Sequence, residues 1–150
     1  MRYVYWIVVM SAVSIVLGLG ASRVQPQQKS QQKTSTSDDI QRGKYLVEEV
    51  AKCQECHTPR NQNNELDSDR WLQGAPTWIR PVFPTTDWAA FAPRLAGLPS
   101  YTDEQAERIL EKGERANGGG EVQQPMHVYH MNHADAKAIV AYLRSLSVQN

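Results

Sequence analysis

Apolar and small residues recur at helical spacing in three separate stretches of the chain. The first stretch runs from about residue 38 to residue 52, where steps of three and four connect Ile40, Gly43, Val47, Val50 and Ala51. Residues at these steps share one face of an α-helix. Ser37 or Asp38 can act as the N-cap, because a short side-chain oxygen accepts a hydrogen bond from a free backbone N–H there. The pattern predicts an amphipathic helix.

The second and third stretches carry signals at their ends. Thr102 and Gln105 have the spacing of a capping box, and Gly113 is suited to end the helix. The third stretch begins near Asn132, and Asp135 suits the positive end of a helix dipole. Its apolar face consists of Ala138, Ile139, Tyr142, Leu143 and Leu146. The spacing predicts a C-terminal amphipathic helix.

The N-terminal segment has a different pattern. Residues 3–21 are uncharged and apolar or small, and they lie between Arg2 and Arg23. The run of about 19 residues is close to the length that spans a bilayer, and it is longer than the usual apolar core of a signal peptide. We expect residues 1–21 to form an uncleaved signal-anchor helix, with a cleaved signal peptide as the alternative.

Polar residues dominate the next segment, 22–37, which is rich in Gln, Ser, Thr and Lys. Such a composition buries too little surface to offset the entropy of an ordered chain. It predicts a flexible linker, which leaves residues 38–150 as the globular domain. The whole chain has 16 basic and 16 acidic residues, so no basic excess indicates nucleic-acid binding.

The first helix leads into Cys53-Gln54-Glu55-Cys56-His57. A CxxCH sequence is the attachment signature of a c-type haem, with two thiols for the porphyrin and a histidine for the iron. A zinc site or a redox dithiol is the alternative for the CxxC spacing. Structural zinc needs four ligands, and the chain has two cysteines. A redox dithiol is typical of a different, βαβ context. We therefore expect one covalent haem on Cys53, Cys56 and His57.

A proline-rich stretch separates the first two helices. Its prolines are Pro76, Pro81, Pro84, Pro93 and Pro99. Proline at this density excludes a regular helix or central strand, and a long loop is natural where the chain wraps a cofactor. Trp71, Trp78 and Trp88 lie in this stretch, and we expect them to pack against the cofactor and the core.

The sixth iron ligand has several candidates. Met126 follows Pro125 in a loop, where a stiffened chain can hold a thioether over the porphyrin, so it is favoured over Met131 at a helix start. His127, His130 and His133 would give bis-histidine ligation instead. Because helical periodicity is lacking before Asn132, we interpret these histidines as surface groups.

Residues 38–147 resemble a class I, mitochondrial-type monohaem cytochrome c. The resemblance rests on Gly43, on the CxxCH sequence, on Pro125-Met126 and on the closing helix with Tyr142. It implies an all-α fold of three main helices and long loops around one haem c, preceded here by the N-terminal hydrophobic helix. It also implies His57 and Met126 as iron ligands. Segments such as 71–76 and 92–99 are similar to small bacterial cytochromes c and to cytochrome subunits of periplasmic dehydrogenases.

The resemblance implies a single-electron carrier rather than an enzyme, on the extracytoplasmic side of a bacterial membrane. The alternative is a haem-bearing subunit fixed in a larger membrane electron-transfer complex or dehydrogenase. A small haem peroxidase is a third hypothesis, in which His127 or His130 would act beside an open iron. Expected partners are redox proteins or such a complex, with the N-terminal helix in the membrane and the haem domain in the periplasm. Signal cleavage would instead give a soluble periplasmic protein.

Overall fold

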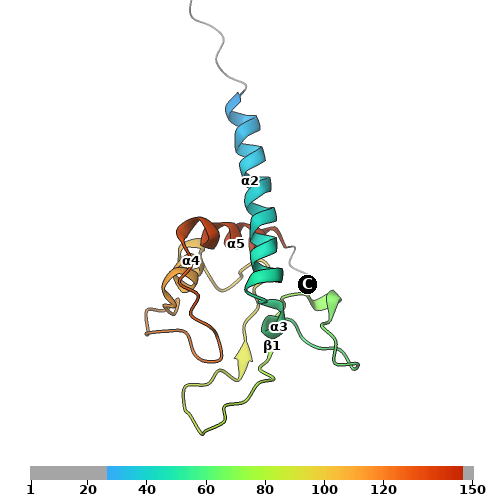
Figure 1. Ribbon diagram of the computed structural model, residues 1–150, viewed down its shortest axis with the longest axis vertical. Helices are drawn as coiled ribbons and strands as arrows, with labels where there is room; N and C mark the ends of the chain where they lie inside the picture. The colour runs from blue at the N-terminus through green and yellow to red at the C-terminus, as the bar shows by residue number, and fades with distance from the viewer. Residues whose placement is uncertain (1–26, 147–150) are drawn as a thin grey trace, which may run out of the picture. The chain divides into compact units, whose positions relative to one another are not determined.

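Helices make up most of the regular structure in the computed structural model, which describes residues 27–146, with side chains from residue 36 (Figure 1). The chain divides into two units, Met1–Gln32 and Lys33–Asn150. The elements are α2 (Gln27–Tyr45), the π-helical turn η1 (Leu46–Val50), α3 (Gln54–His57), the 3-10 turn η2 (Ser68–Arg70), β1 (Ala75–Pro76), β2 (Phe91–Ala92), α4 (Asp103–Lys112) and α5 (His133–Ser145). The prediction of a mainly helical domain is confirmed.

Helix α2 begins earlier than the apolar pattern predicts. It is continuous from Gln27, so Ser37 and Asp38 lie inside the helix and neither is its N-cap. Residues 27–37, which belong to the segment expected to be a flexible linker, are helical in the structure. The flexibility of that linker stays a prediction. No glycine or proline occurs from residue 27 to residue 42, and glutamine and lysine are good helix formers. The apolar stripe marks where a helix can pack, not where it begins.

The first helix ends in a wider turn, which changes the face that its last residues present. In η1 the amide of Ala51 donates to the carbonyl of Leu46, five residues back, at 2.8 Å. Val47 is buried as predicted, but Val50 is exposed, so its place in the predicted stripe is wrong. A π-helical turn takes more residues than an α-helical one and shifts the periodicity.

Helices α4 and α5 begin where the sequence predicts. The Thr102 hydroxyl accepts from the amide of Gln105 at 3.2 Å, and the Gln105 side chain accepts from the amide of Thr102 at 2.9 Å. Gly113 ends α4 in the left-handed conformation with φ of 70°. Asn132 caps α5 by accepting from the amide of Asp135 at 3.0 Å. Both predicted helix ends of α4 and the start of α5 are confirmed.

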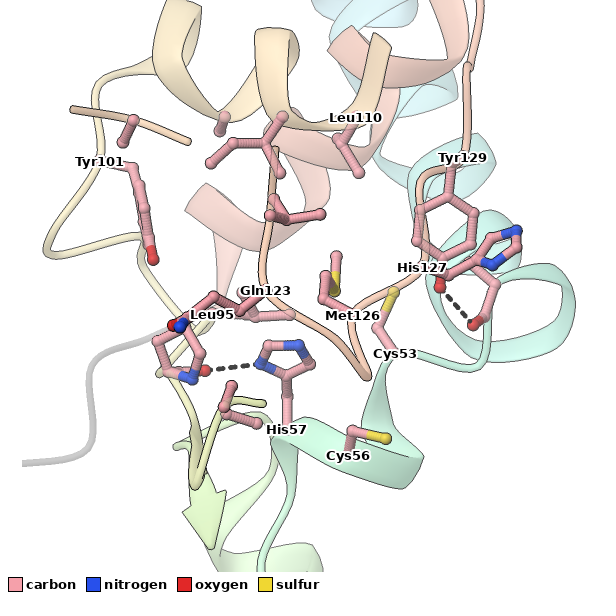
Figure 2. A pocket seen from close by; sticks show the side chains of 18 of the residues that line it. Cys53, Cys56, His57, Leu95, Tyr101, Leu110, Gln123, Met126, His127 and Tyr129 are labelled. Carbon is pink, nitrogen blue, oxygen red and sulfur yellow. Dashed lines mark hydrogen bonds between the residues drawn. The ribbon is translucent and has the colours of Figure 1, made fainter. Parts of the chain in front are cut away.

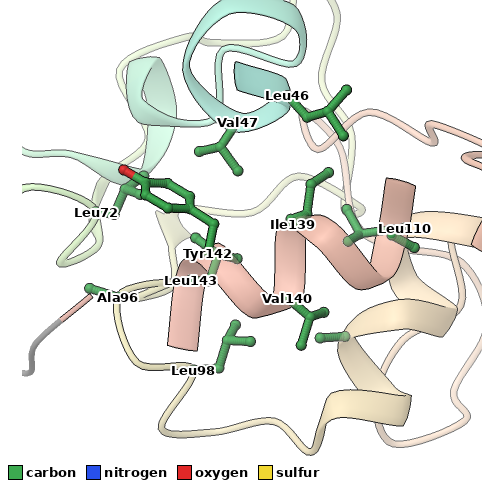
Figure 3. Packing of buried hydrophobic residues seen from close by; sticks show 12 residues of the cluster. Leu46, Val47, Leu72, Ala96, Leu98, Leu110, Ile139, Val140, Tyr142 and Leu143 are labelled. Carbon is green, nitrogen blue, oxygen red and sulfur yellow. The ribbon is translucent and has the colours of Figure 1, made fainter. Parts of the chain in front are cut away.

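Helix α5 supplies the centre of the hydrophobic core (Figure 3). The core residues are Leu46, Val47, Leu72, Ala96, Leu98, Ala106, Leu110, Ala136, Ile139, Val140, Tyr142 and Leu143. They come from η1, α4, α5 and the irregular stretch between α3 and α4. Tyr142 donates to Glu48 at 2.5 Å, which adds a polar link between α5 and η1.

The stretch between α3 and α4 contains little regular structure, as its prolines predict. One two-residue antiparallel pairing joins β1 to β2, with Ala75 opposite Ala92. Of the tryptophans, Trp71 packs against the core, as expected. Trp78 is more than half exposed and does not belong to the core cluster, so the expectation that it packs against the core is wrong. Its indole N–H instead donates to the carbonyl of Glu55 at 3.0 Å.

The expected N-terminal helix lies outside the described residues. Within 27–146, no helix is long and apolar enough to cross a membrane.

Gly43 allows α2 to approach α5 closely. A Cβ atom here would lie 1.9 Å from the carbonyl oxygen of Ala138 and 2.8 Å from Cβ of Tyr142. The glycine in the first helix and the aromatic residue in the last therefore meet at a crossing, as the resemblance implies. A side chain at this position would collide with backbone atoms, which cannot move away by rotamer changes.

We therefore expect Gly43→Ala to destabilise the protein. Overpacking costs about 1–3 kcal/mol, which exceeds the gain of about 1 kcal/mol from the better helix propensity of alanine. Urea unfolding followed by circular dichroism measures the change. Gly119→Ala is the control, because its Cβ would meet only the exposed Asn117 side chain, and its effect should stay within about 0.5 kcal/mol. Equal effects of the two substitutions would contradict the crossing.

Candidate haem site

The CxxCH sequence forms the short helix α3. Cys53 is its N-cap residue, and the amide of His57 donates to the carbonyl of Cys53 at 3.0 Å. This single turn brings Cys53, Cys56 and His57 to one cavity, where Figure 2 shows them. Lys52, just before the turn, has a positive φ of 52°, which separates η1 from α3. The end of the first helix therefore delivers all three side chains together.

The cavity has a volume of about 540 Å³ and a mainly apolar wall. This volume is within the usual range of roughly 300–1,000 Å³ for ligand sites. Its apolar lining includes Leu95, Leu98, Ala106, Ile109, Leu110, Ile139 and Leu143. Leu98, Ala106, Leu110, Ile139 and Leu143 also belong to the hydrophobic core, so the core forms part of the cavity wall. Polar residues Arg115, Asn117 and Gln123 also line it.

His57 is buried and held in one orientation. Its Nδ1 lies 2.6 Å from the carbonyl oxygen of Pro93. A carbonyl oxygen can only accept, so Nδ1 carries the hydrogen and Nε2 keeps its lone pair. Burial lowers the pKa of His57, against the smaller effect of this hydrogen bond. The imidazole is therefore neutral at pH 7, which is the form that binds a metal.

Both thiols are poor acids in this environment. Burial raises the pKa of Cys53 to about 11. Burial and the negative charge of Glu55 raise the pKa of Cys56, and Arg60 opposes them. Redox dithiols instead use thiolates with a lowered pKa. In the described part of the chain, no group of three or more His, Cys, Asp or Glu side chains could hold a metal ion. The geometry supports neither the redox dithiol nor the zinc site.

Met126 lines the same cavity as His57 (Figure 2). Met131 packs against the core instead. Of the three candidate histidines, His127 lines the cavity, with its ring edge-on to Tyr129 at 5.0 Å between centroids. His133 is at the surface and bonds to Glu111 at 2.8 Å. The remaining candidate, His130, is also exposed. The structure thus brings Met126 and His127, but neither His130 nor His133, to the cavity.

Two further residues of the site could not be recognised from the sequence. Pro93 acts through its backbone carbonyl, which any residue could supply. Tyr129 lines the cavity, and its hydroxyl donates to the carbonyl of Ala51 at 3.1 Å, which ties the far wall to the chain before α3. Burial raises the pKa of Tyr129 to about 12, so the phenol stays protonated.

A family model for cytochrome c matches residues 40–147. The chain belongs to the cytochrome c family. Cytochrome c domains carry haem c, and the residues here fit it: two protonated thiols on one helical turn, a neutral imidazole with a free Nε2, and an apolar cavity between them and Met126. The family is one of electron-transfer proteins rather than enzymes, as the sequence predicts.

Three relatives are similar to this cytochrome. The fructose dehydrogenase cytochrome subunit of Gluconobacter japonicus is 34% identical over 116 residues, which is 73% of this chain and 22% of that protein. The gluconate 2-dehydrogenase cytochrome c subunit of Pantoea cypripedii is 30% identical over 139 residues, 83% of this chain and 30% of that protein. The expected similarity to dehydrogenase cytochrome subunits is confirmed.

A third match is short. A diheme c-type cytochrome of Cereibacter sphaeroides is 56% identical over 36 residues, 24% of this chain and 12% of that protein. The chain spans less than a third of the length of each of the three relatives.

We expect the cytochrome to lose covalent haem when both thiols are removed. In Cys53→Ala/Cys56→Ala, acidic organic solvent should extract the haem, whereas either single variant should retain it through one thioether. The double variant should also be largely unfolded when haem-free, because the apolar cavity would then face water. Haem-stained gels and circular dichroism measure these effects. A well-folded, haem-free double variant would contradict this account of the site.

Proposed function

We propose that this cytochrome is a single-electron carrier with one covalent haem c, ligated by His57 and Met126. The observation that carries the proposal is the shared cavity, in which an oriented imidazole and a thioether both meet the space beside Cys53 and Cys56. Haem c supplies an iron that gains or loses one electron. His57 and Met126 would hold the iron from the protein, which would leave no ligand position for a substrate.

The residues around the cavity favour this role. The Pro93 carbonyl fixes the His57 ring, so the ligand does not reorient when the charge of the site changes. The apolar wall excludes water, and a thioether ligand together with low polarity raises the reduction potential. Thr58, the residue after His57, accepts from the amide of Leu72 at 2.9 Å, which also stiffens this side of the cavity.

The runner-up is a haem-bearing subunit fixed in a larger dehydrogenase or membrane complex. It is supported by two relatives that are themselves named as dehydrogenase cytochrome subunits. A peroxidase has less support. His127 does line the cavity, but it does so together with Met126, which would have to leave the iron.

The ligand assignment predicts different effects for two methionines. Met126→Leu should abolish the weak far-red sulfur-to-iron absorption band of the oxidised protein and lower its reduction potential, because the thioether is lost. Met131→Leu conserves volume in the same way and should change neither. Absorption spectra and potentiometric titration measure both. Loss of the band only in Met131→Leu would transfer the ligand to Met131, and loss in neither would favour a histidine such as His127.

We further propose that residues 1–21 anchor the cytochrome to the membrane, with the haem domain on the periplasmic side. The uncharged run of residues 3–21 supports the anchor. The cytochrome should then remain in membranes washed with high salt. Replacing residues 1–24 with a cleavable signal should release it as a soluble holoprotein with an unchanged spectrum. A mature N-terminus between Ala21 and Gln25 in a soluble periplasmic fraction would contradict the anchor.

A further inference from the structure

The loop between β1 and β2 exposes an unusual amount of apolar surface. Val82 is 90% exposed, Phe83 79% and Trp78 57%, and Ile79 between them is also exposed. In Figure 1 this loop extends away from α4 and α5. Trp78, Ile79, Val82 and Phe83 are called the apolar tip below. Single exposed apolar residues are ordinary, but four within six positions mark an interaction surface.

Trp78 and Ile79, at the start of the apolar tip, are held in place by hydrogen bonds. The Trp78 indole N–H donates to the carbonyl of Glu55 at 3.0 Å. The guanidinium of Arg60 lies 5.3 Å from the Trp78 ring centroid and pairs with the Glu55 carboxylate at 2.9 Å. Trp88 donates to the carbonyl of Ile79 at 3.2 Å. A fixed aromatic side chain loses little entropy on binding, which is typical of residues that dominate interface energies.

The apolar tip also adjoins the haem site. Trp78 contacts Glu55, the neighbour of Cys56, and Cys56 is only partly buried. From the same loop, Thr77 and Ala89 line the cavity. A protein bound on the tip would therefore lie beside the attachment residue Cys56. A redox partner must approach this part of the molecule closely, whereas a purely structural partner need not.

Charge indicates the kind of surface that the tip can meet. Between residues 77 and 92 the charged residues are Arg80 and Asp87, and Asp87 pairs with Arg115 at 3.0 Å. Membrane-surface segments are rich in lysine and arginine, and this loop is not. The loop also lacks the charges that would attract a strongly charged protein partner. The matching surface is an apolar protein hollow.

We propose that the apolar tip is the docking surface for a redox partner protein, which receives Trp78, Val82 and Phe83 in an apolar hollow and binds with little dependence on salt. The proposal rests on the electron-carrier function above and names where the partner of that same site binds.

The first test identifies what covers the tip. A photoreactive amino acid is placed at Phe83 of the full chain in its native host, and the cross-linked product is identified by mass spectrometry. We expect a protein that carries a redox cofactor. The same probe at Tyr45, which is 53% exposed on α2, should not give this product. Cross-linking to lipid, to a second copy of this chain, to a protein without a redox cofactor, or to nothing would overturn the proposal.

The second test measures affinity for the partner so identified. Trp78→Ala, and separately Val82→Ser/Phe83→Ser, should each weaken binding by at least about tenfold. Tyr45→Ala should change it by less than about twofold, as a residue outside the interface. Binding of the unmodified cytochrome should change little as ionic strength rises. The serine variant removes no hydrogen bond of the tip, so unchanged affinity there overturns the docking surface.

Failure of the docking proposal is separable from failure of the proposed function. Haem content, the far-red band and reduction by dithionite are measured on every variant. If these are normal while affinity does not change, only the docking surface is wrong. If the unmodified protein holds no reducible haem, the electron-carrier function itself is wrong.

Discussion

The cavity beside α3 is apolar, so the His57 imidazole inside it has to be neutral and to keep one orientation. The hydrogen bond from His57 to the Pro93 carbonyl fixes that orientation. The loops around α3 place that carbonyl. Gly74 donates to the carbonyl of His57 at 2.8 Å, and its lack of a side chain lets the strand containing Ala92 pass close by, since a Cβ there would lie 3.0 Å from the Ala92 oxygen. The segment that carries His57 and the segment that orients it are thus joined at the backbone. The irregular stretch between α3 and α4 therefore holds His57 in position.

Local chemistry explains why much of the fold can be predicted from the sequence. The capping box of α4 and the Asn132 cap of α5 depend on residues three positions apart, so the sequence alone contains both partners. The CxxCH turn is local for the same reason. The apolar face of α5 follows from simple periodicity, and Ile139 and Tyr142 are buried as that periodicity predicts.

The features that could not be predicted depend on contacts distant in sequence or on a change of helical period. Val50 is exposed because η1 is a π-helical turn, and no residue type in the sequence predicts such a turn. The role of Pro93 belongs to its carbonyl, 36 positions from His57. Trp78 is a large apolar residue of the kind expected in a core, but it is exposed, and its N–H donates to the carbonyl of Glu55, 23 positions away in the sequence.

The far wall of the cavity raises a different physical problem, because Met126 belongs to no helix. Backbone hydrogen bonds hold the Met126 segment in place instead of a helix. Val122 donates to Gly113 at 2.7 Å before Met126, and Met131 donates to Leu110 at 3.0 Å after it, so both ends of the segment are fixed to the C-terminal end of α4. Between them the amide of Met126 donates to the carbonyl of Gln123 at 3.0 Å. Met126 is the proposed iron ligand, and this support would lower the entropy that its flexible side chain loses on binding. His127 follows Met126, and the backbone hydrogen bonds before and after this segment supply its stiffness.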